Sequence, residues 1–328
     1  YQPRTWYRET EEGFNCLMSK GGKPLNLTNN RDSQNYIAVD FGTTHIKTAV
    51  FDGDGHLLEI QKVSTPDCGD EFGNVYDPLL IYEIISGQIS CLLKRFDRVK
   101  GVSITGMAEA GLIVNRKRMA EETPLLPWFD QRTQMLSQQL DHNAEVSNFC
   151  RTGLRNSYKY GIYKYLWLLR HYQLPKKETV WLSAGDYIVW KLTGSFASDP
   201  SFAARTYVYD IIHCCWDKQR LARYGLTPDN FPRAIPSGEI AGYLSDRCIL
   251  PEAYTDPVPV CIGGHDHVCA AYAVLEEDAG QICNSIGTAE TYLGIEPGNN
   301  FALTEAHYQS GMVYGPFIKG KRYFWMAN

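Results

Sequence analysis

The clearest indication of the fold is the run Tyr36-Ile-Ala-Val-Asp40-Phe-Gly42-Thr43-Thr44-His-Ile-Lys47-Thr-Ala-Val50-Phe51. Apolar runs stand on both sides of a Gly-Thr-Thr corner, and Asp52-Gly-Asp-Gly55 turns the chain again. The pattern predicts a meander of three strands that ends near Val63. Glycine lets a ligand approach the backbone, and successive N–H groups at such a corner form a concavity that binds anions. We therefore expect Gly42, Thr43 and Thr44 to hold a phosphate.

Two charged residues flank this corner. Asp40 lies at the end of the first expected strand, where its carboxylate is placed to hold Mg²⁺ directly or through water. Lys47 lies on the second strand, within reach of a phosphate oxygen. The alternative is an ordinary hairpin, which is what most Gly-Thr turns are.

The same pattern returns in Gln281-Ile-Cys-Asn-Ser285-Ile-Gly287-Thr288-Ala-Glu-Thr-Tyr-Leu293. One Gly-Thr hairpin carries little information, but two in one chain suggest a duplicated fold that holds the phosphates of a nucleotide from both sides. Gly287 and Thr288 are then the second set of phosphate contacts.

A carboxylate corner precedes the second turn. The run Val258-Pro-Val-Cys-Ile262 predicts a buried strand, and the small residues of Val268–Val274 predict a closely packed helix. Asp266, in Gly263-Gly-His265-Asp266-His267, opens that helix and is our candidate general base. A plain helix cap is the alternative. The two histidines invite a metal site, which we rank low because no third ligand is apparent; we expect one of them to orient Asp266.

Four motifs occur in order: Val39-Asp-Phe-Gly-Thr-Thr44, Trp128-x-Asp130-x-Arg132, Gly263-Gly-His-Asp-His267 and Ser285-Ile-Gly-Thr288. Together they resemble the FGGY carbohydrate kinases, of the xylulokinase, gluconokinase and glycerol kinase types. The resemblance runs from about Tyr36 to the last residue. No single motif is decisive, but their order and spacing are specific.

The resemblance implies an α/β fold of the ribonuclease H-like type, shared with actin and hexokinase. Residues 1–35 would be an N-terminal extension, 36–270 the N-terminal kinase domain, and 271–328 the first strands of a C-terminal domain that is cut short. The implied reaction is ATP-dependent phosphorylation of a sugar, sugar acid or polyol, with Mg²⁺ as cofactor and Asp266 as the base. We expect this chain by itself to show little kinase activity.

The resemblance also assigns a sugar site. Glu109 stands at a sugar-contacting position, in Met107-Ala108-Glu109, where xylulokinases typically have Gln-Met-His and glycerol kinases Arg-Glu. Trp128, Asp130 and Arg132 share one face if their segment is extended, so that an indole and two charged groups would meet the sugar. Tyr160 and His267 complete the set. A packed tryptophan beside a surface ion pair is the alternative. The departure at 107–109 leaves the sugar open.

Composition restricts the classes of function. The chain has 328 residues, 44% of them hydrophobic and 21% charged, which is ordinary for a globular protein of about two domains. A net charge of −5 gives no electrostatic support to nucleic-acid binding. No apolar run approaches ~18 residues, so we expect no membrane helix. The first residues lack a basic segment followed by an apolar core, so we expect no signal peptide.

Ten cysteines without a C-x-x-C pair argue against zinc and for a reducing cytoplasm. The partner is a small molecule, with no nucleic acid and no membrane; the family resemblance allows a homodimer.

Periodicity predicts further elements. We expect helices over 77–96, 133–149, 162–172, 180–192 and 216–224, and strands over 100–105 and 111–114. Gly315-Pro-Phe-Ile-Lys-Gly320-Lys321 nearly matches a P-loop, but Arg322 stands where Ser or Thr is required, and we interpret it as a hairpin turn.

Two rival classes of function remain open. One is a non-catalytic sugar-binding or regulatory relative, and the other is a different ATPase of the same fold, such as a chaperone or an actin-like protein, because this fold hosts many functions.

Overall fold

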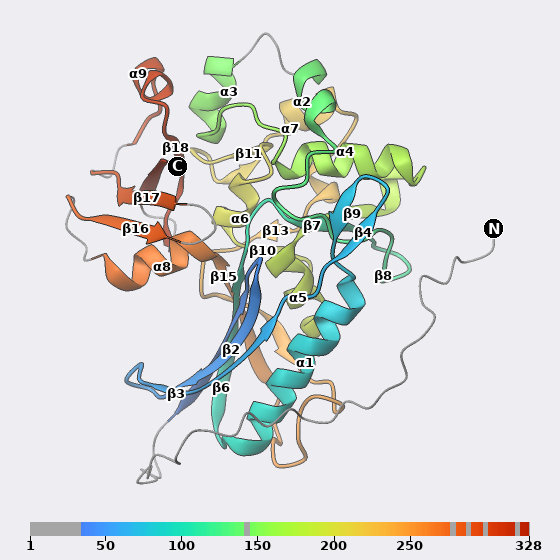
Figure 1. The fold of residues 1–328 in the computed structure, drawn as a ribbon, viewed down its shortest axis with the longest axis vertical. Coiled ribbons are helices and arrows are strands. Elements are labelled where there is room, and N and C mark those ends of the chain that lie inside the picture. The colour runs from blue at the N-terminus through green and yellow to red at the C-terminus, as the bar shows by residue number, and fades with distance from the viewer. Residues whose placement is uncertain are drawn as a thin grey trace. The chain divides into compact units, whose positions relative to one another are not determined.

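The computed structural model describes residues 34–140, 145–275, 280–286, 290–297, 301–318 and 322–327. Its centre is a mixed sheet in the order β14-β15-β6-β1-β2-β3 (Figure 1). The strands are β1 (Asn35–Phe41), β2 (His45–Phe51), β3 (Leu57–Ser64), β6 (Val99–Gly106), β14 (Ile240–Leu244) and β15 (Val258–His265). The predicted meander of β1, β2 and β3 is confirmed as two antiparallel pairs. β6 and β15 join beside it, parallel to β1 and to each other.

Helices cover this sheet because their apolar stripes face it. α1 (Pro78–Arg95) begins at the N-cap Asp77, whose carboxylate accepts from the backbone N–H groups of Leu79 and Leu80. α1 contacts β2, and α5 (Ala184–Thr193) contacts β6, β14 and β15. The apolar side chains between these layers form the largest core of the chain.

The expected helix over 180–192 is wrong in its first part. Residues Thr179–Ser183 form β9, a fully buried strand that pairs with β7 (Gly111–Asn115), which in turn pairs with β8 (Ala120–Glu121). A short apolar run is ambiguous between a strand and a buried helix, and here Ser183 ends the strand and caps α5.

The expected helix over 133–149 is two helices, α2 (Gln134–Leu140) and α3 (Glu145–Thr152), with residues 141–144 outside the described part. The remaining helices are α4 (Gly161–His171), α6 (Pro200–Ala204), α7 (Lys218–Arg223), α8 (Asp266–Val274) and α9 (Glu305–Gln309), with 3₁₀ turns at Lys176–Glu178 and Pro228–Asn230. Three two-stranded ribbons add β4 (Cys68–Asp70) with β5 (Gly73–Val75), β10 (Ala197–Ser198) with β13 (Arg233–Ala234), and β11 (Tyr209–Asp210) with β12 (Cys215–Trp216).

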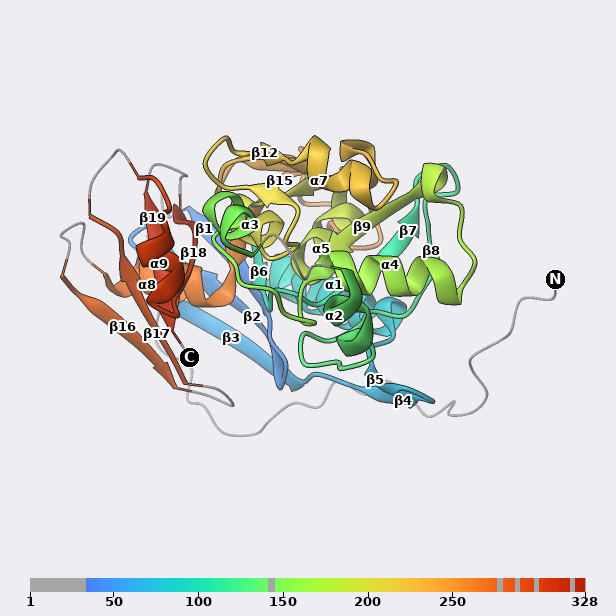
Figure 2. The same cartoon turned by 90° about the horizontal axis from the view of Figure 1, so that it is seen from above.

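A second sheet follows α8 in the order β16-β17-β19-β18, built from β16 (Ile282–Ile286), β17 (Glu290–Ile295), β18 (Val313–Pro316) and β19 (Tyr323–Ala327). Figure 2 shows it with α8 and α9 close to its strands. Both hairpins expected from the sequence are confirmed, since β16 pairs with β17 and β18 pairs with β19. The boundary near residue 270 between two domains stays a prediction. Of the expected N-terminal extension, residues 1–33 lie outside the described part, and Asn35 already belongs to β1.

Gly153 ties the end of α3 to the second sheet. Its φ is +71°, its N–H donates to the Phe149 carbonyl (2.8 Å), and its carbonyl accepts from the Tyr314 N–H of β18 (2.8 Å). A Cβ at this position would stand 2.2 Å from the Tyr314 carbonyl oxygen. Only glycine fits here, because both the left-handed backbone and the close approach exclude a side chain.

We predict that Gly153→Ala lowers the free energy of unfolding more than Gly194→Ala. Gly194 has a similar φ of +74°, but an added Cβ meets nothing within 4 Å. The control should therefore cost only the left-handed conformation, about 1–2 kcal/mol, and Gly153→Ala about 1–3 kcal/mol more for the overlap with β18. Denaturant unfolding of both variants measures the difference; equal losses would show that β18 does not pack closely on Gly153.

Candidate active site

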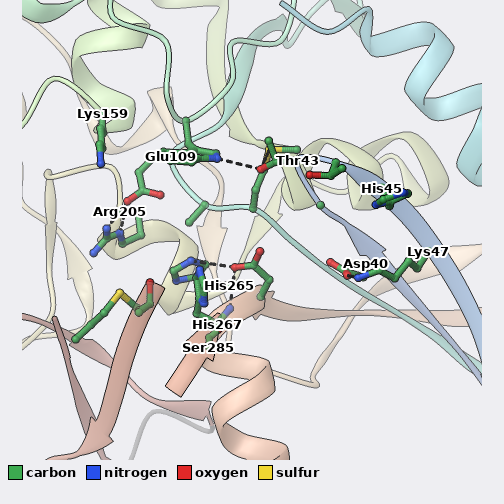
Figure 3. Close-up of a pocket in the computed structure, with 18 residues that line it drawn as sticks. Asp40, Thr43, His45, Lys47, Glu109, Lys159, Arg205, His265, His267 and Ser285 are labelled. Carbon is green, nitrogen blue, oxygen red and sulfur yellow. Dashed lines mark hydrogen bonds and ion pairs between the residues drawn. The ribbon is translucent and has the colours of Figure 1, made fainter. Parts of the chain in front are cut away.

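A cleft of about 410 Å³ opens where β1, β6 and β15 end. Because these three strands are parallel, their carboxyl ends meet at one edge of the sheet, where ligands bind in open α/β sheets. The cleft brings together nine of the residues expected from the sequence: Asp40, Gly42, Thr43, Thr44, Lys47, Glu109, Trp128, Asp266 and His267. Figure 3 shows Glu109 on one side, Asp40 and Lys47 on the other, and His265 and His267 between them.

Asp266 is the first residue of α8, and His265 occupies the N-cap position. Its Oδ1 lies 3.1 Å from Nε2 of the buried His265 and accepts from the His267 backbone N–H at 2.7 Å. Burial alone would raise the pKa of Asp266, but the hydrogen bond and charge of His265, together with His267, bring it below the ordinary range for aspartate. An ionised carboxylate at a helix N-terminus, facing a cleft, is a proton acceptor.

A bulge aims this corner into the cleft. The pairing of β15 with β6 is irregular between Ile262 and Gly264, and Gly264 has a φ of +114°. An added Cβ on Gly264 would lie 2.6 Å from Oδ1 of Asp199. Behind it, the His265 N–H donates to Ser201 Oγ (2.9 Å), and Ser201 Oγ donates to Asp199. Bulges of this kind commonly redirect side chains beside active sites.

The metal-binding alternative at this corner has partial geometric support. One ligand atom each from His265, Asp266 and His267 lies within 4.8 Å of the others. Burial lowers the pKa of His267, so its imidazole is neutral near pH 7. The hydrogen bond between His265 and Asp266, however, already engages two of the three groups. The arrangement therefore favours a histidine that orients the carboxylate.

The Gly42–Thr44 corner forms the opposite wall of the cleft. The Gly42 N–H donates to the His45 carbonyl (3.1 Å), and Thr65 Oγ1 donates to the Gly42 carbonyl (2.7 Å), which fixes the turn. Thr43 Oγ1 accepts from the Trp128 indole N–H at 3.0 Å. The corner is thus held from both sides.

Asp40 and Lys47 form a cross-strand ion pair next to this corner, 2.9 Å from Oδ2 to Nζ. Burial raises the pKa of Asp40, while the ammonium of Lys47 counteracts part of that effect. Asp40 Oδ1 is buried and has no hydrogen-bond partner among the described residues. An unused carboxylate oxygen beside a phosphate-type turn fits a hard divalent cation such as Mg²⁺.

Glu109 lies buried at the other end of the cleft, in a left-handed backbone conformation (φ +59°). Its Oε1 accepts from Nε of Arg205 at 2.6 Å and also from Nη2. Burial would raise the pKa of Glu109, but the charges of Arg205 and His265 hold it below its ordinary range. Glu109 is therefore ionised and positioned by Arg205.

The sequence reasoning missed Arg205, although a signal was present. This arginine interrupts an otherwise apolar stretch, 202–209, and a cation in such a run requires a buried carboxylate. Other lining residues that were not assigned a role include His45, Lys159, Ser285, Thr291 and Met326. His265 was expected only as one of the two histidines that could orient Asp266. Gly287 and Thr288 lie outside the described residues, but Ser285 and Thr291, a paired position of the same hairpin, line the cleft.

Asp130 and Arg132 are placed differently from the expectation. Residues 128–129 form a turn and not an extended segment, so the three side chains do not share a face. Arg132 Nε bonds Asp130 (2.8 Å), and its two terminal nitrogens bond Asp70 (2.8 and 3.0 Å). Neither Asp130 nor Arg132 lines the cleft.

The guanidinium of Arg132 lies 5.4 Å from the Phe72 ring and 4.9 Å from the Trp167 ring. It holds the β4–β5 hairpin against α4, and removing one partner of a buried pair of this kind costs about 3–5 kcal/mol. Tyr160 also stays outside the cleft, where its ring stacks on Tyr207 and lies 5.6 Å from the Arg205 guanidinium.

Lys164 is a fully buried lysine beneath the cleft. Its Nζ donates to the carbonyls of Trp128 (3.3 Å) and Lys159, so it supports two lining residues from behind. Burial lowers the pKa of Lys164 to about 7, against the opposing effect of Glu109 and Asp130.

This buried lysine predicts a pH dependence of stability. Between pH 7 and the ordinary lysine pKa the unfolded state binds more protons than the folded state, so stability rises with pH. One such group contributes roughly 2 kcal/mol between pH 7 and 9. We expect Lys164→Met to remove that part of the rise, whereas Lys177→Met, an exposed lysine, should keep it. Denaturant unfolding at several pH values measures both slopes, and parallel curves for wild type and Lys164→Met would contradict the assignment.

No helix in the described ranges is long and apolar enough to cross a lipid bilayer.

The chain is similar in sequence to curated kinases. The chain is 27% identical over 271 residues to a xylulose kinase of Staphylococcus xylosus, covering 81% of this chain and 56% of that protein. It is 26% identical over 299 residues to a glycerol kinase of Beijerinckia indica subsp. indica, covering 84% and 59%. The chain thus spans a little over half of the curated relatives it matches.

The solved structure of a xylulose kinase from Rhodospirillum rubrum superimposes with a TM-score of 0.78 at 18% identity, covering 90% of this chain and 60% of that one. The α/β fold of the ribonuclease H-like type is confirmed. Residues 35–273 match the N-terminal domain of one family over more than half of the chain. The chain belongs to the FGGY family of carbohydrate kinases, and these residues are its N-terminal domain.

Proposed function

We propose that the protein transfers the γ-phosphoryl group of ATP to a hydroxyl of a sugar, sugar acid or polyol. The observation that carries the proposal is the position of Asp266, an ionised carboxylate between the Glu109–Arg205 pair and the Gly42–Thr44 corner. A substrate hydroxyl bound near Glu109 would lie in the same cleft as Asp266, its base, and as a phosphate bound at the Gly42–Thr44 corner. Phosphoryl transfer depends on this kind of positioning and on charge stabilisation.

Each part of the cleft has a role in this reaction. Asp266 takes the proton of the attacking hydroxyl, and His265 keeps its carboxylate oriented through the 3.1 Å contact. Glu109, fixed by Arg205, accepts hydrogen bonds from substrate hydroxyls, and the indole of Trp128 offers an apolar face. The backbone N–H groups of Thr43 and Thr44, with Lys47, receive phosphate oxygens, while the Gly42 N–H holds the turn through the His45 carbonyl. Gly287 and Thr288 remain the predicted contacts on the second hairpin.

Asp40 is the residue that would hold Mg²⁺, through the carboxylate oxygen that no described residue satisfies. The cation, when bound with ATP, neutralises charge on the transferring phosphate.

The cellular setting follows from the thiols. Within the described ranges all nine cysteines are free, which fits a reducing compartment, and we propose a cytoplasmic location.

The family resemblance allows a homodimer, and we predict that light scattering on the purified protein will show one. A monomer at micromolar concentration would contradict this prediction.

The central prediction concerns Asp266. We expect Asp266→Asn to lower kcat about 10²–10⁴-fold, the usual contribution of general base catalysis. The sugar KM should change little, because the amide keeps the shape of the carboxylate. The measurement is sugar-dependent ADP release by the full protein, with Asp256→Asn, an exposed loop carboxylate, as the matched control.

Three results would contradict the proposal in different ways. Full turnover by Asp266→Asn would remove Asp266 as the base while leaving a kinase. ADP release that no sugar stimulates would favour an ATPase of the chaperone or actin-like kind. Sugar binding without any ADP release would favour a non-catalytic relative.

A further inference from the structure

Among the described residues that line the cleft, every carboxylate and every cation except Lys159 belongs to an ion pair. Asp40 pairs with Lys47, Glu109 with Arg205, and Asp266 with His265. Lys159 also lines the cleft, and within the described ranges no carboxylate forms an ion pair with it. Its Nζ lies 5.0 Å from the centre of the Trp128 ring, so the ammonium rests on the face of the indole.

Lys159 is held in place by the fold. Its carbonyl accepts from the buried Nζ of Lys164, which also bonds the Trp128 carbonyl, so the backbone that carries Lys159 is tied to the tryptophan beneath its side chain. The side chain is half-buried and reaches the cleft from the turn just before α4. Because the indole holds the Lys159 ammonium at the cleft, the ammonium is in position to bind a ligand there.

Its location fixes which part of a ligand it meets. Figure 3 shows Lys159, Glu109 and Arg205 on one side of the cleft, and Asp40 with Lys47 on the other. The Trp128 indole lies between Lys159 and Thr43 of the Gly42–Thr44 corner. On this side of the cleft, Lys159 and Arg205 carry two positive charges and Glu109 carries one negative charge, which leaves one positive charge in excess. Glu109 accepts hydrogen bonds only from Nε and Nη2 of Arg205. Nη1 of Arg205 is buried without a hydrogen-bond partner in the described residues.

We propose that the substrate is a sugar acid, whose carboxylate binds Lys159 on the side of the cleft that holds Glu109 and Arg205. This rests on the proposed kinase function and narrows its substrate class. A carboxylate carries one negative charge, which matches the single unpaired cation among the described lining residues, whereas a phosphomonoester carries nearly two. The carbon chain would then lie on the Trp128 indole, with its hydroxyls at Glu109 and the reacting hydroxyl at Asp266.

The test compares acids with neutral molecules of the same shape. Aldonates of four to six carbons, such as D-gluconate, are paired with their alditols, such as D-glucitol, which replace the carboxylate by a hydroxymethyl group. Calorimetry and sugar-dependent ADP release on the full protein give Kd and kcat/KM. We expect an aldonate to bind roughly 10-fold to 100-fold more tightly than its alditol, with a kcat/KM higher by a similar factor. This is the range of a charge-assisted hydrogen bond. High salt should weaken the binding of the acid, because it screens the charges, and should leave the binding of the alditol unchanged.

Variants locate the preference. Lys159→Met should bring the affinities for the acid and the alditol to within about 3-fold of each other, because it removes the charge-assisted bond. Lys159→Arg should keep most of the preference, and Lys177→Met, the exposed lysine outside the cleft, should keep all of it. Melting curves confirm that each variant is folded, and the wild-type comparison does not depend on any variant.

The outcomes separate this inference from the function beneath it. If ketoses or alditols are phosphorylated as well as the acids, or if Lys159→Met retains the preference, the sugar-acid assignment is wrong and the kinase stands. If neither aldonates nor alditols bind or stimulate ADP release, both the kinase proposal and the sugar-acid assignment are wrong.

Discussion

The cleft depends on three parallel strands that stop at the same edge of the central sheet. β1 delivers Asp40 and the Gly42–Thr44 corner, β6 delivers the loop with Glu109, and β15 delivers Asp266. Segments more than 200 residues apart in the chain therefore meet because of strand register. The irregular pairing between Ile262 and Gly264 lies just before Asp266, and bulges commonly redirect side chains beside active sites.

Charge pairing explains which groups are rigid and which remain free to act. A carboxylate buried alone would take up a proton, so Glu109 stays ionised only because Arg205 stands against it. Asp266 stays ionised through His265, whose backbone is held by Ser201 and, behind it, Asp199. Asp40 keeps one oxygen without a partner. In the proposed kinase, these three groups would be the substrate anchor, the base and the ligand for Mg²⁺.

Sequence reasoning found the strand ends but not the partners that arrive from elsewhere in the fold. The Gly-Thr corners and the Gly-Gly-His-Asp corner are local patterns, and local patterns predicted nine lining residues. Arg205 and Lys159 belong to turns with no motif, so only the packing of α4 and α6 brings them to the cleft. For Arg132 a local pattern was misleading. Alternation suggested that its side chain shares a face with those of Trp128 and Asp130, but residues 128–129 form a turn. The Arg132 side chain instead bonds the carboxylate of Asp70, 62 positions away, under the β4–β5 hairpin.

The two ends of the cleft are also connected through a single side chain. Trp128 donates its indole N–H to Thr43 in the phosphate corner, and its ring lies beneath Lys159 on the substrate side. Lys164 fixes the Trp128 carbonyl from below, so the indole has little freedom to move without disturbing one contact or another. A substrate that packs on this ring therefore bears on the hydrogen bond that holds the Thr43 hydroxyl. Binding energy from a remote part of a substrate contributes to catalysis when it orders the reacting centre. Under the proposed function, Trp128 would be the physical link by which sugar occupancy orders the Gly42–Thr44 corner.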